Sequence, residues 1–269
     1  MSLTRILIIA YTLFSLFALN AYADGHRLSS AVNDASRSAD NKARDVYRHP
    51  KETLQFFQIK PSMKVLEILP GHGWYTEILA PYLADKGHLT VASFGANHPT
   101  KYLANFHNDF VKMMTANPKT YAKVDVVSIK EDTYLQSIPD TSLDMILTFR
   151  NSHNWIRYGG ITERYVAFNR VLKSGGILGV VQHRAADGGD HKVTAEKGYI
   201  PESYLIRLIE DQGFELMGTS EINSNPKDTR DHPEGVWTLP PSYRLKDIDK
   251  EKYTAIGESD RMTLRFVKK

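Results

Sequence analysis

A short turn with two glycines is the first feature of the sequence that could do chemistry. Pro70-Gly71-His72-Gly73 directly follows the apolar residues 65–69. A residue without a Cβ lets the backbone approach a ligand closely and adopts conformations that other residues avoid. Glu67 puts a carboxylate just before the turn, where it can order the turn or accept a hydrogen bond from a cationic ligand. The sequence therefore predicts a ligand-binding turn at the end of a buried strand.

Alternating strands and helices must position this turn. The apolar runs predict strands at residues 65–69, 89–94, 124–129, 143–149, 177–181 and 214–222. Helical periodicity predicts helices at residues 74–84, 100–116 and 162–172, and a further helix between Pro201 and Gly213. Near the end, Met262, Leu264 and Phe266 alternate with polar residues, which is typical of an antiparallel strand near an edge. This order predicts an α/β fold, a doubly wound and mostly parallel sheet of seven strands with an antiparallel last strand.

Two segments do not follow this alternation of strands and helices. Residues 24–61 are expected to form an N-terminal arm and a helix that begins at Pro50, before the α/β domain of residues 62–269. The arm carries charges of both signs, and its basic residues are most simply explained as a solvated face; they are Arg37, Lys42, Arg44 and Arg48. Residues 223–260 hold four prolines and few apolar side chains, so we expect a lid, a binding loop or a flexible segment.

The composition excludes several classes of chemistry. The chain has 269 residues, with 34 basic and 31 acidic side chains, a formal charge of +3 and no cysteine. The absence of cysteine excludes disulfides, zinc–thiolate sites, iron–sulfur clusters and thiol catalysis. The small charge excess does not indicate a nucleic-acid partner. The composition is that of a soluble globular protein with a full core.

The first 23 residues have the pattern of a cleavable export signal. Arg5 is their only charged side chain, and residues 6–19 form an apolar run that is short for a membrane span. Ala21-Tyr22-Ala23 then matches the small-x-small pattern of a signal-peptidase site. We expect cleavage after Ala23 and a periplasmic or secreted protein without a stable membrane anchor. An uncleaved membrane anchor is the alternative.

Residues 65–76, Val-Leu-Glu-Ile-Leu-Pro-Gly-His-Gly-Trp-Tyr-Thr, resemble the first motif of class I S-adenosylmethionine-dependent methyltransferases. The acidic loop before strand four of that family resembles residues 131–144. The junction before its strand five resembles residues 170–176. The resemblance covers residues 50–269 and is closest to a group of bacterial methyltransferases that carry export signals. It implies a Rossmann-like methyltransferase fold, S-adenosylmethionine as cofactor, and methyl transfer to an oxygen or nitrogen of a small-molecule or surface acceptor whose identity is open.

The resemblance also implies roles for individual residues. Glu67, Pro70, Gly71 and Gly73 would surround the amino-acid part of the cofactor. The other cofactor contacts would be made by the adenine partners Glu131 and Asp132, and by two residues near the sulfonium, Arg150 and Asn151. A carbonyl- and aromatic-lined pocket suits a sulfonium because both groups offer negative potential. Arg48-His49-Pro50 could close over this pocket.

The sequence departs from the family pattern at two points. Leu69 stands where many members have their first glycine, and no acid lies between Asp85 and Asp109 to bind the ribose hydroxyls. Ser93 or Asn97 could make a neutral hydrogen bond there instead. Two alternatives remain. One is an exported, non-catalytic α/β ligand-binding protein. The other is a nicotinamide dehydrogenase, which ranks lower because Thr76 replaces its third glycine.

Methyl transfer to a protonated nucleophile needs a base beside the acceptor. His153, in a loop expected after the fourth strand, is our candidate for that base, with Asn154 and Trp155 to position the acceptor. His183, at the end of the fifth strand, is the second candidate, and each histidine could instead be an ordinary loop residue. A metal site is a weaker alternative, with a spacing that matches no known ligand geometry; it would use His183, Asp187, Asp190 and His191.

Overall fold

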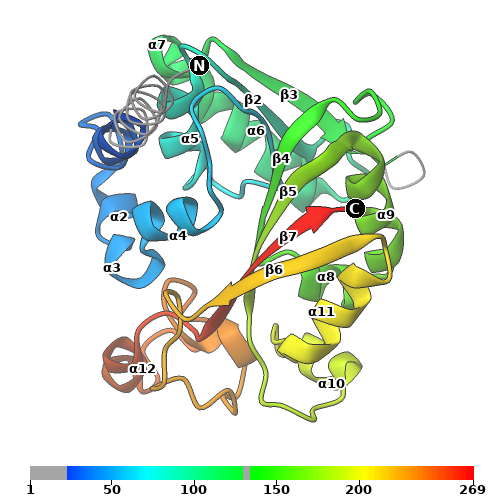
Figure 1. Cartoon of the computed structure of the whole chain (residues 1–269). Coiled ribbons are helices and arrows are strands. Elements are labelled where there is room, and N and C mark those ends of the chain that lie inside the picture. The colour runs from blue at the N-terminus through cyan, green and yellow to red at the C-terminus, as the bar shows by residue number, and fades with distance from the viewer. Residues whose placement is uncertain (1–22, 130–133) are drawn as a thin grey trace, which may run out of the picture.

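The computed structural model describes residues 23–129 and 134–269. Its centre is one seven-stranded sheet with the order β3-β2-β1-β4-β5-β7-β6 (Figure 1). The strands are β1 Lys64–Ile68, β2 His88–Phe94, β3 Val124–Ile129, β4 Leu143–Phe149, β5 Leu172–His183, β6 Phe214–Ser220 and β7 Arg261–Lys268. The doubly wound α/β fold predicted from the sequence is confirmed.

Strand direction fixes where a ligand site belongs. β1 pairs in parallel with β2 on one side and with β4 on the other. The chain therefore reverses its direction of winding between β1 and β4, and open sheets of this kind bind ligands at the carboxyl ends of the strands beside such a point. β7 is antiparallel to both β5 and β6, so the last strand lies one position inside the edge that β6 forms.

Helices cover both faces of the sheet (Figure 1). They are α2 Ala39–Lys42, α3 Asp45–Arg48, α4 Pro50–Phe56, α5 Thr76–Leu83, α6 Lys101–Ala116, α7 Pro118–Tyr121, α8 Ser152–Arg157, α9 Ile161–Val171, α10 His191–Glu196, α11 Glu202–Glu210 and α12 Lys250–Ile256, with a short 3₁₀ helix η1 at Gly235–Thr238. Successive strand residues point to opposite faces, so Met145 and Leu147 pack in the cluster with α4, α5 and α6, whereas Ile146 packs with α8, α9 and α11. None of the helices in the described residues is both long and apolar enough to cross a bilayer.

β5 begins five residues earlier than the sequence predicts. Ser174-Gly175-Gly176 was expected to be a loop, but Leu172 already pairs with Leu143. The next pair joins Ile177 to Met145, so β5 holds extra residues opposite a single residue of β4. Gly175 has a φ of +74°, which a strand can accommodate at such a bulge. The glycines therefore interrupt the strand without ending it.

Buried polar groups bind the segment 223–260 to the rest of the domain. The carboxylate of Asp228 accepts hydrogen bonds from the Tyr199 hydroxyl at 3.0 Å and from the backbone N–H of Asp260 at 2.8 Å, and it contacts Nε2 of His232 at 2.9 Å. Arg184 also reaches Asp260 from the end of β5. This segment, which includes η1 and α12, therefore packs as part of the domain near the start of β7 (Figure 1).

Candidate functional site

The glycine turn lies directly beyond β1. Leu69, Gly71 and Gly73 have φ values of +48°, +66° and +80°. The N–H of Gly73 closes the turn by donating to the oxygen of Pro70 at 3.1 Å. Leu69 thus adopts the left-handed conformation at the position where the resembling family has its first glycine, and its backbone N–H is held by the oxygen of Ala92 at 2.8 Å. Three of the five residues 69–73 are therefore left-handed, which gives the turn its tight bend, and Gly73 is buried within it.

The two glycines have different surroundings. A Cβ on Gly73 would lie 2.4 Å from Cε of Met113 and 3.3 Å from the ring of Phe110, so this glycine allows α6 to pack against the turn. A Cβ on Gly71 would meet only the tip of Phe106, at 3.8 Å. Gly71 therefore borders the open side of the turn, where a ligand could approach the backbone.

Glu67 lies inside the fold, below the turn. Its side chain is 1% exposed and accepts a hydrogen bond from the hydroxyl of Thr76 at 2.7 Å. Burial raises the pKa of Glu67 to about 7, and the bond from Thr76 only partly opposes this rise. The carboxyl group links the end of β1 to the first turn of α5, so it orders the glycine turn from beneath.

β4 and β1 are joined at their ends by Asn151. Its side-chain amide donates to the oxygen of Ile68 at 3.0 Å and to the hydroxyl of Thr148 at 3.2 Å. The preceding residue, Arg150, has a φ of +64°, and its N–H donates to the oxygen of Val181 at 2.7 Å. The two residues predicted to follow strand four therefore lie at the winding reversal of the sheet.

Aromatic side chains line the region between β1 and β4. Tyr75 stacks on Phe149 with ring centroids 3.6 Å apart and planes 10° from parallel. Trp74 lies edge-on to Tyr75 and donates from Nε1 to the oxygen of Asn41 in the arm at 2.9 Å. All three rings are buried, and the guanidinium of Arg48 lies 4.8 Å from the centroid of Trp74, so the rings pack the region beside the turn.

The two candidate histidines are neighbours, with ring centroids 5.6 Å apart. The side-chain nitrogen of Gln182 donates to Nδ1 of His153 at 3.2 Å and to the oxygen of Gly198 at 3.2 Å. The carbonyl of Gly198 fixes the orientation of the amide, so Nδ1 of His153 accepts and its proton lies on Nε2. Burial lowers the pKa of His153 to about 4. His153 is therefore a neutral, buried hydrogen-bonded ring.

His183 is the more accessible of the pair. It is half-buried, and its Nδ1 lies 2.5 Å from the hydroxyl of Ser259. Burial, followed by the neighbouring His153 and the positive charge of Arg150, lowers the pKa of His183 well below its usual range. Asn154 is half-buried one position after His153, and Trp155 is buried against Tyr165 and Phe168 in the core.

The arm brings arginines to the same end of the sheet. The solvated face expected from the sequence is wrong for Arg37 and Arg48, because both are buried. Arg37 makes two hydrogen bonds to Asp45, at 2.8 and 2.9 Å, while Arg48 lies over Trp74 and donates from Nε to Glu258 at 3.0 Å. The alternative interpretation, in which Arg48-His49-Pro50 closes over the site, stays a prediction.

Glu258 was missed by sequence reasoning, as was its partner Arg261. Glu258 accepts hydrogen bonds from Arg44 at 2.7 Å, Arg48 at 3.0 Å and Arg261 at 3.0 Å. Burial alone would raise the pKa of Glu258, but these arginines lower it to about 2. No local pattern marks this cluster, since 210 residues separate Arg48 from Glu258.

The remaining candidates for cofactor contacts are Ser93, Asn97, Glu131 and Asp132. Ser93, a candidate for the ribose, is 2% exposed and pairs with Nδ1 of His107 at 3.2 Å, so it serves the packing of α6. Asn97 is exposed beyond β2. Glu131 and Asp132, the predicted adenine partners, lie outside the described residues.

The proposed metal cluster does not assemble. Nδ1 of His183 contacts Ser259, Asp190 caps α10, and His191 stacks on Tyr204 at 3.8 Å. Within residues 23–129 and 134–269, no three histidine or acidic side chains come close enough to hold a metal ion.

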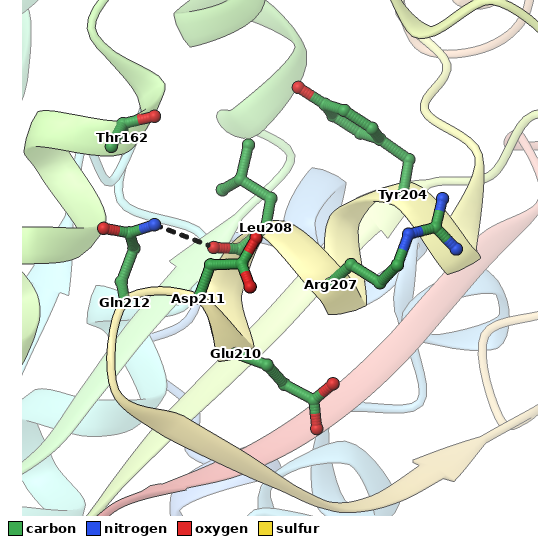
Figure 2. Close-up of a pocket in the computed structure, with 7 residues that line it drawn as sticks. All are labelled: Thr162, Tyr204, Arg207, Leu208, Glu210, Asp211 and Gln212. Atoms are coloured by element: carbon green, nitrogen blue, oxygen red, sulfur yellow. Dashed lines mark hydrogen bonds between the residues drawn. The ribbon is translucent and has the colours of Figure 1, made fainter.

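Two surface cavities lie away from the turn. One, of about 360 Å³, lies between α9 and α11 and is lined by Thr162, Tyr204, Arg207, Leu208, Glu210, Asp211 and Gln212 (Figure 2). The other, of about 570 Å³, is bordered by Arg184, Glu202 and Arg230. These three residues are engaged in ion pairs with neighbouring side chains.

Comparison with solved structures confirms the fold. The chain is similar to a SAM-dependent methyltransferase from Aquifex aeolicus (TM-score 0.54, 18% identity, covering 67% of this chain and 87% of the other). It is also similar to an arsenic(III) S-adenosylmethionine methyltransferase from Chlamydomonas reinhardtii (TM-score 0.54, 13% identity, 90% and 73%). A third similar structure is the [4+2]-cyclase SpnF (TM-score 0.54, 16% identity, 93% and 94%). No protein-family model and no curated protein matches the sequence.

Proposed function

We propose that this protein is an S-adenosylmethionine-dependent methyltransferase. The observation that carries the proposal is the turn of residues 69–73, which presents three left-handed residues at the carboxyl end of β1, beside the winding reversal. Open α/β sheets bind their ligands at this place. The similarity to solved methyltransferases supports the proposal at the level of the fold.

The turn fits the amino-acid part of the cofactor. Gly71 leaves its backbone approachable, and Glu67 and Asn151 hold the turn from below and from the side. The adenine would be held by Glu131 and Asp132, as the family resemblance implies. When bound, S-adenosylmethionine would supply an electrophilic methyl group, and this chain would supply alignment and a proton acceptor.

The two histidines suit different tasks. The lone pair of His153 on Nδ1 is occupied by Gln182, so we assign His153 and the adjacent Asn154 to positioning the acceptor. His183 is half-buried at the end of β5, and its lowered pKa leaves the ring neutral but weakly basic; we assign to it, for its position, the removal of the acceptor's proton. His183 can be a base only in the tautomer that donates from Nδ1 to Ser259, which leaves Nε2 free to accept.

Calorimetric titration with S-adenosylmethionine and S-adenosylhomocysteine tests the proposal. We expect both compounds to bind, and the His183→Gln variant to bind them as the wild type does. Absence of heat at millimolar concentrations would refute the proposal and favour the non-catalytic ligand-binding alternative. A third titration, with NAD, separates a dehydrogenase from both.

We also propose that the protein works after export, and that the signal of residues 1–23 is removed. Residues 24–32, which directly follow the expected cut, are helical, and Leu28 and Ala31 pack into the core there. Cleavage after Ala23 would therefore leave a terminus that is close to a packed element. Osmotic-shock fractionation, with mass spectrometry of the released protein, tests both the location and the cut. An uncleaved chain in the cytosolic fraction would contradict this proposal.

A further inference from the structure

Four arginines and a single carboxylate meet beside the candidate site. Arg44 and Arg48 come from the arm, Arg150 follows β4, and Arg261 begins β7. Arg44, Arg48 and Arg261 all donate to Glu258. The cluster therefore holds four positive charges and one negative charge. Like charges brought together at low exposure are costly unless an anion compensates them.

Arg150 is the member without a partner. Within the described residues, its guanidinium makes no hydrogen bond or ion pair, although the residue is only partly exposed and the charges of Glu258, Arg261 and Arg44 act on it. Arg48 is more deeply buried, with 3% of its side chain exposed, and only its Nε bonds to Glu258. Both residues therefore retain terminal N–H groups that protein acceptors leave unused. A guanidinium with free N–H groups is suited to binding a carboxylate or phosphate in two places at once.

The arginines lie close to the histidine proposed as the base. The positive charges of Arg150, Arg261 and Arg48 all act on the ring of His183. Burial is the main cause of the low pKa of that ring, and the arginines lower it further; the same charges would favour a negatively charged group held next to the ring. The end of β4, where Arg150 stands, is also where an acceptor would meet the cofactor.

We infer that Arg48 and Arg150 bind an anionic group of the methyl acceptor, so that the acceptor is a carboxylate- or phosphate-bearing molecule. This inference rests on the proposed methyltransferase function. The cofactor itself does not satisfy the cluster, because its carboxylate is outweighed by its ammonium and sulfonium groups and it carries a net positive charge. An anionic acceptor would balance both the arginines and the sulfonium.

Calorimetry with benzoate and with inorganic phosphate tests this inference. Each anion is titrated into the protein alone and into the protein saturated with S-adenosylhomocysteine. We expect at least one anion to bind the wild type, and Arg150→Gln and Arg48→Gln to weaken it about tenfold or more, as for the loss of a charge-assisted hydrogen bond. Arg150 makes no side-chain hydrogen bond to the described residues and is repelled by Arg261 and Arg44, so its variant should melt no lower than the wild type.

Arg207→Gln is the matched control. It removes the same charge from an exposed residue at the surface cavity beside α11 (Figure 2). Anion affinity should stay within about twofold of the wild-type value in this variant, because an exposed, distant charge contributes little. Equal weakening in Arg207→Gln and Arg150→Gln would overturn the inference, as would failure of both anions to bind the wild type.

Two further titrations separate this inference from the proposed function. If the arginines instead held the carboxylate of the cofactor, Arg150→Gln would weaken S-adenosylhomocysteine and leave methylthioadenosine, which has no carboxylate, unchanged. That result would overturn the anionic-acceptor inference while supporting the methyltransferase proposal. Binding of benzoate or phosphate without binding of S-adenosylhomocysteine would refute the proposed function, and it would show that the arginines bind an anion that is not a methyl acceptor.

Discussion

The side-chain amide of Asn151 donates a hydrogen bond of 3.0 Å to the main-chain oxygen of Ile68, and this bond joins the ends of β4 and β1. Both ends border the winding reversal of the sheet. The bond therefore sets the separation of the two strands at the place where the proposed ligand site opens.

Replacing Asn151 should loosen this junction. We expect Asn151→Ala to lower the free energy of unfolding by about 1–2 kcal/mol, because the oxygen of Ile68 loses its donor. Asn151→Asp should cost more, since a carboxylate would then face a carbonyl oxygen. Urea denaturation measures both changes. Asn97→Asp, at an exposed position, is the control, and equal midpoints for all these variants would contradict the role of Asn151.

Gly71 should be needed for binding more than for folding. Gly71→Val adds a branched side chain on the open side of the turn, and we expect it to weaken S-adenosylhomocysteine by about tenfold or more, which is 1.4 kcal/mol or more. Calorimetry provides the measurement. Gly159→Val is the control, because Gly159 has a φ of +87° and open space around its Cβ position. It should cost similar backbone strain and leave binding intact, so equal loss in both variants would argue against a binding role for Gly71.

Glu67 should make the protein less stable as the pH rises. Its pKa is raised from 4.5 to about 7, so between these values the folded protein holds a proton that the unfolded chain has lost. This contribution is fully present below pH 4.5 and is lost as the pH passes about 7. We expect Glu67→Gln to be up to about 3 kcal/mol more stable than the wild type at pH 8, with a smaller difference at pH 4.5.

Urea unfolding at the two pH values measures the effect of Glu67. Glu215→Gln, at an exposed position of β6, provides the control and should show no such dependence. A Glu67→Gln variant whose advantage is the same at both pH values would refute the assignment.

His153 should remain neutral in mildly acidic solution. Burial lowers its pKa from 6.5 to about 4, so the unfolded chain binds the extra proton first. Its contribution to stability is therefore present above pH 6.5 and is lost as the pH falls toward 4. Nitrogen chemical shifts of the imidazole ring should show the neutral form at pH 5.5, with His153→Gln used to assign the signal. Protonation of this ring near pH 6.5 would contradict the buried hydrogen bond with Gln182.

Removing Glu258 should expose the repulsion within the arginine cluster. We expect Glu258→Gln to lower the free energy of unfolding by about 3–5 kcal/mol at pH 7, as for one member of a buried ion pair. The pKa of Glu258 is lowered from 4.5 to about 2, so its contribution is present above pH 4.5 and fades as the pH falls toward 2. Thermal unfolding across this range measures the loss. The control is Glu234→Gln, whose side chain is exposed beside Arg244 and whose loss should have little effect on stability. A similar loss of stability in Glu234→Gln would contradict the role of Glu258 in compensating the arginines.

Local signals in the sequence were enough to predict the sheet and the turn. The apolar runs around Val65 and Ile146 gave the strands, and Gly71 and Gly73 gave the turn between β1 and α5. Gly175 and Gly176 misled the prediction of β5, because a glycine pair can make a bulge as well as a loop.

The arginine cluster could not be predicted in the same way. Arg48 and Glu258 belong to segments that are polar and rich in prolines or charges, and only the folded chain brings them together. The tautomer of His153 likewise depends on Gln182 and Gly198, which no spacing rule connects to it. Side-chain contacts between residues that are far apart in the chain leave no periodic pattern in the sequence, so sequence patterns do not predict them.

The bond between Arg48 and Glu258 also has a consequence for biosynthesis. Arg48 and Glu258 are 210 residues apart, so the arm leaves the ribosome long before Glu258 is made. A nascent chain that already contains β1 and its glycine turn therefore still lacks the contact that fixes the arm. Contacts between residues with such a large sequence separation form late, because the chain between the two residues must first be closed into a loop. The proposed site is thus completed only after Glu258 has been made, and a chain that ends before Glu258 would carry the turn without the arginine cluster in place.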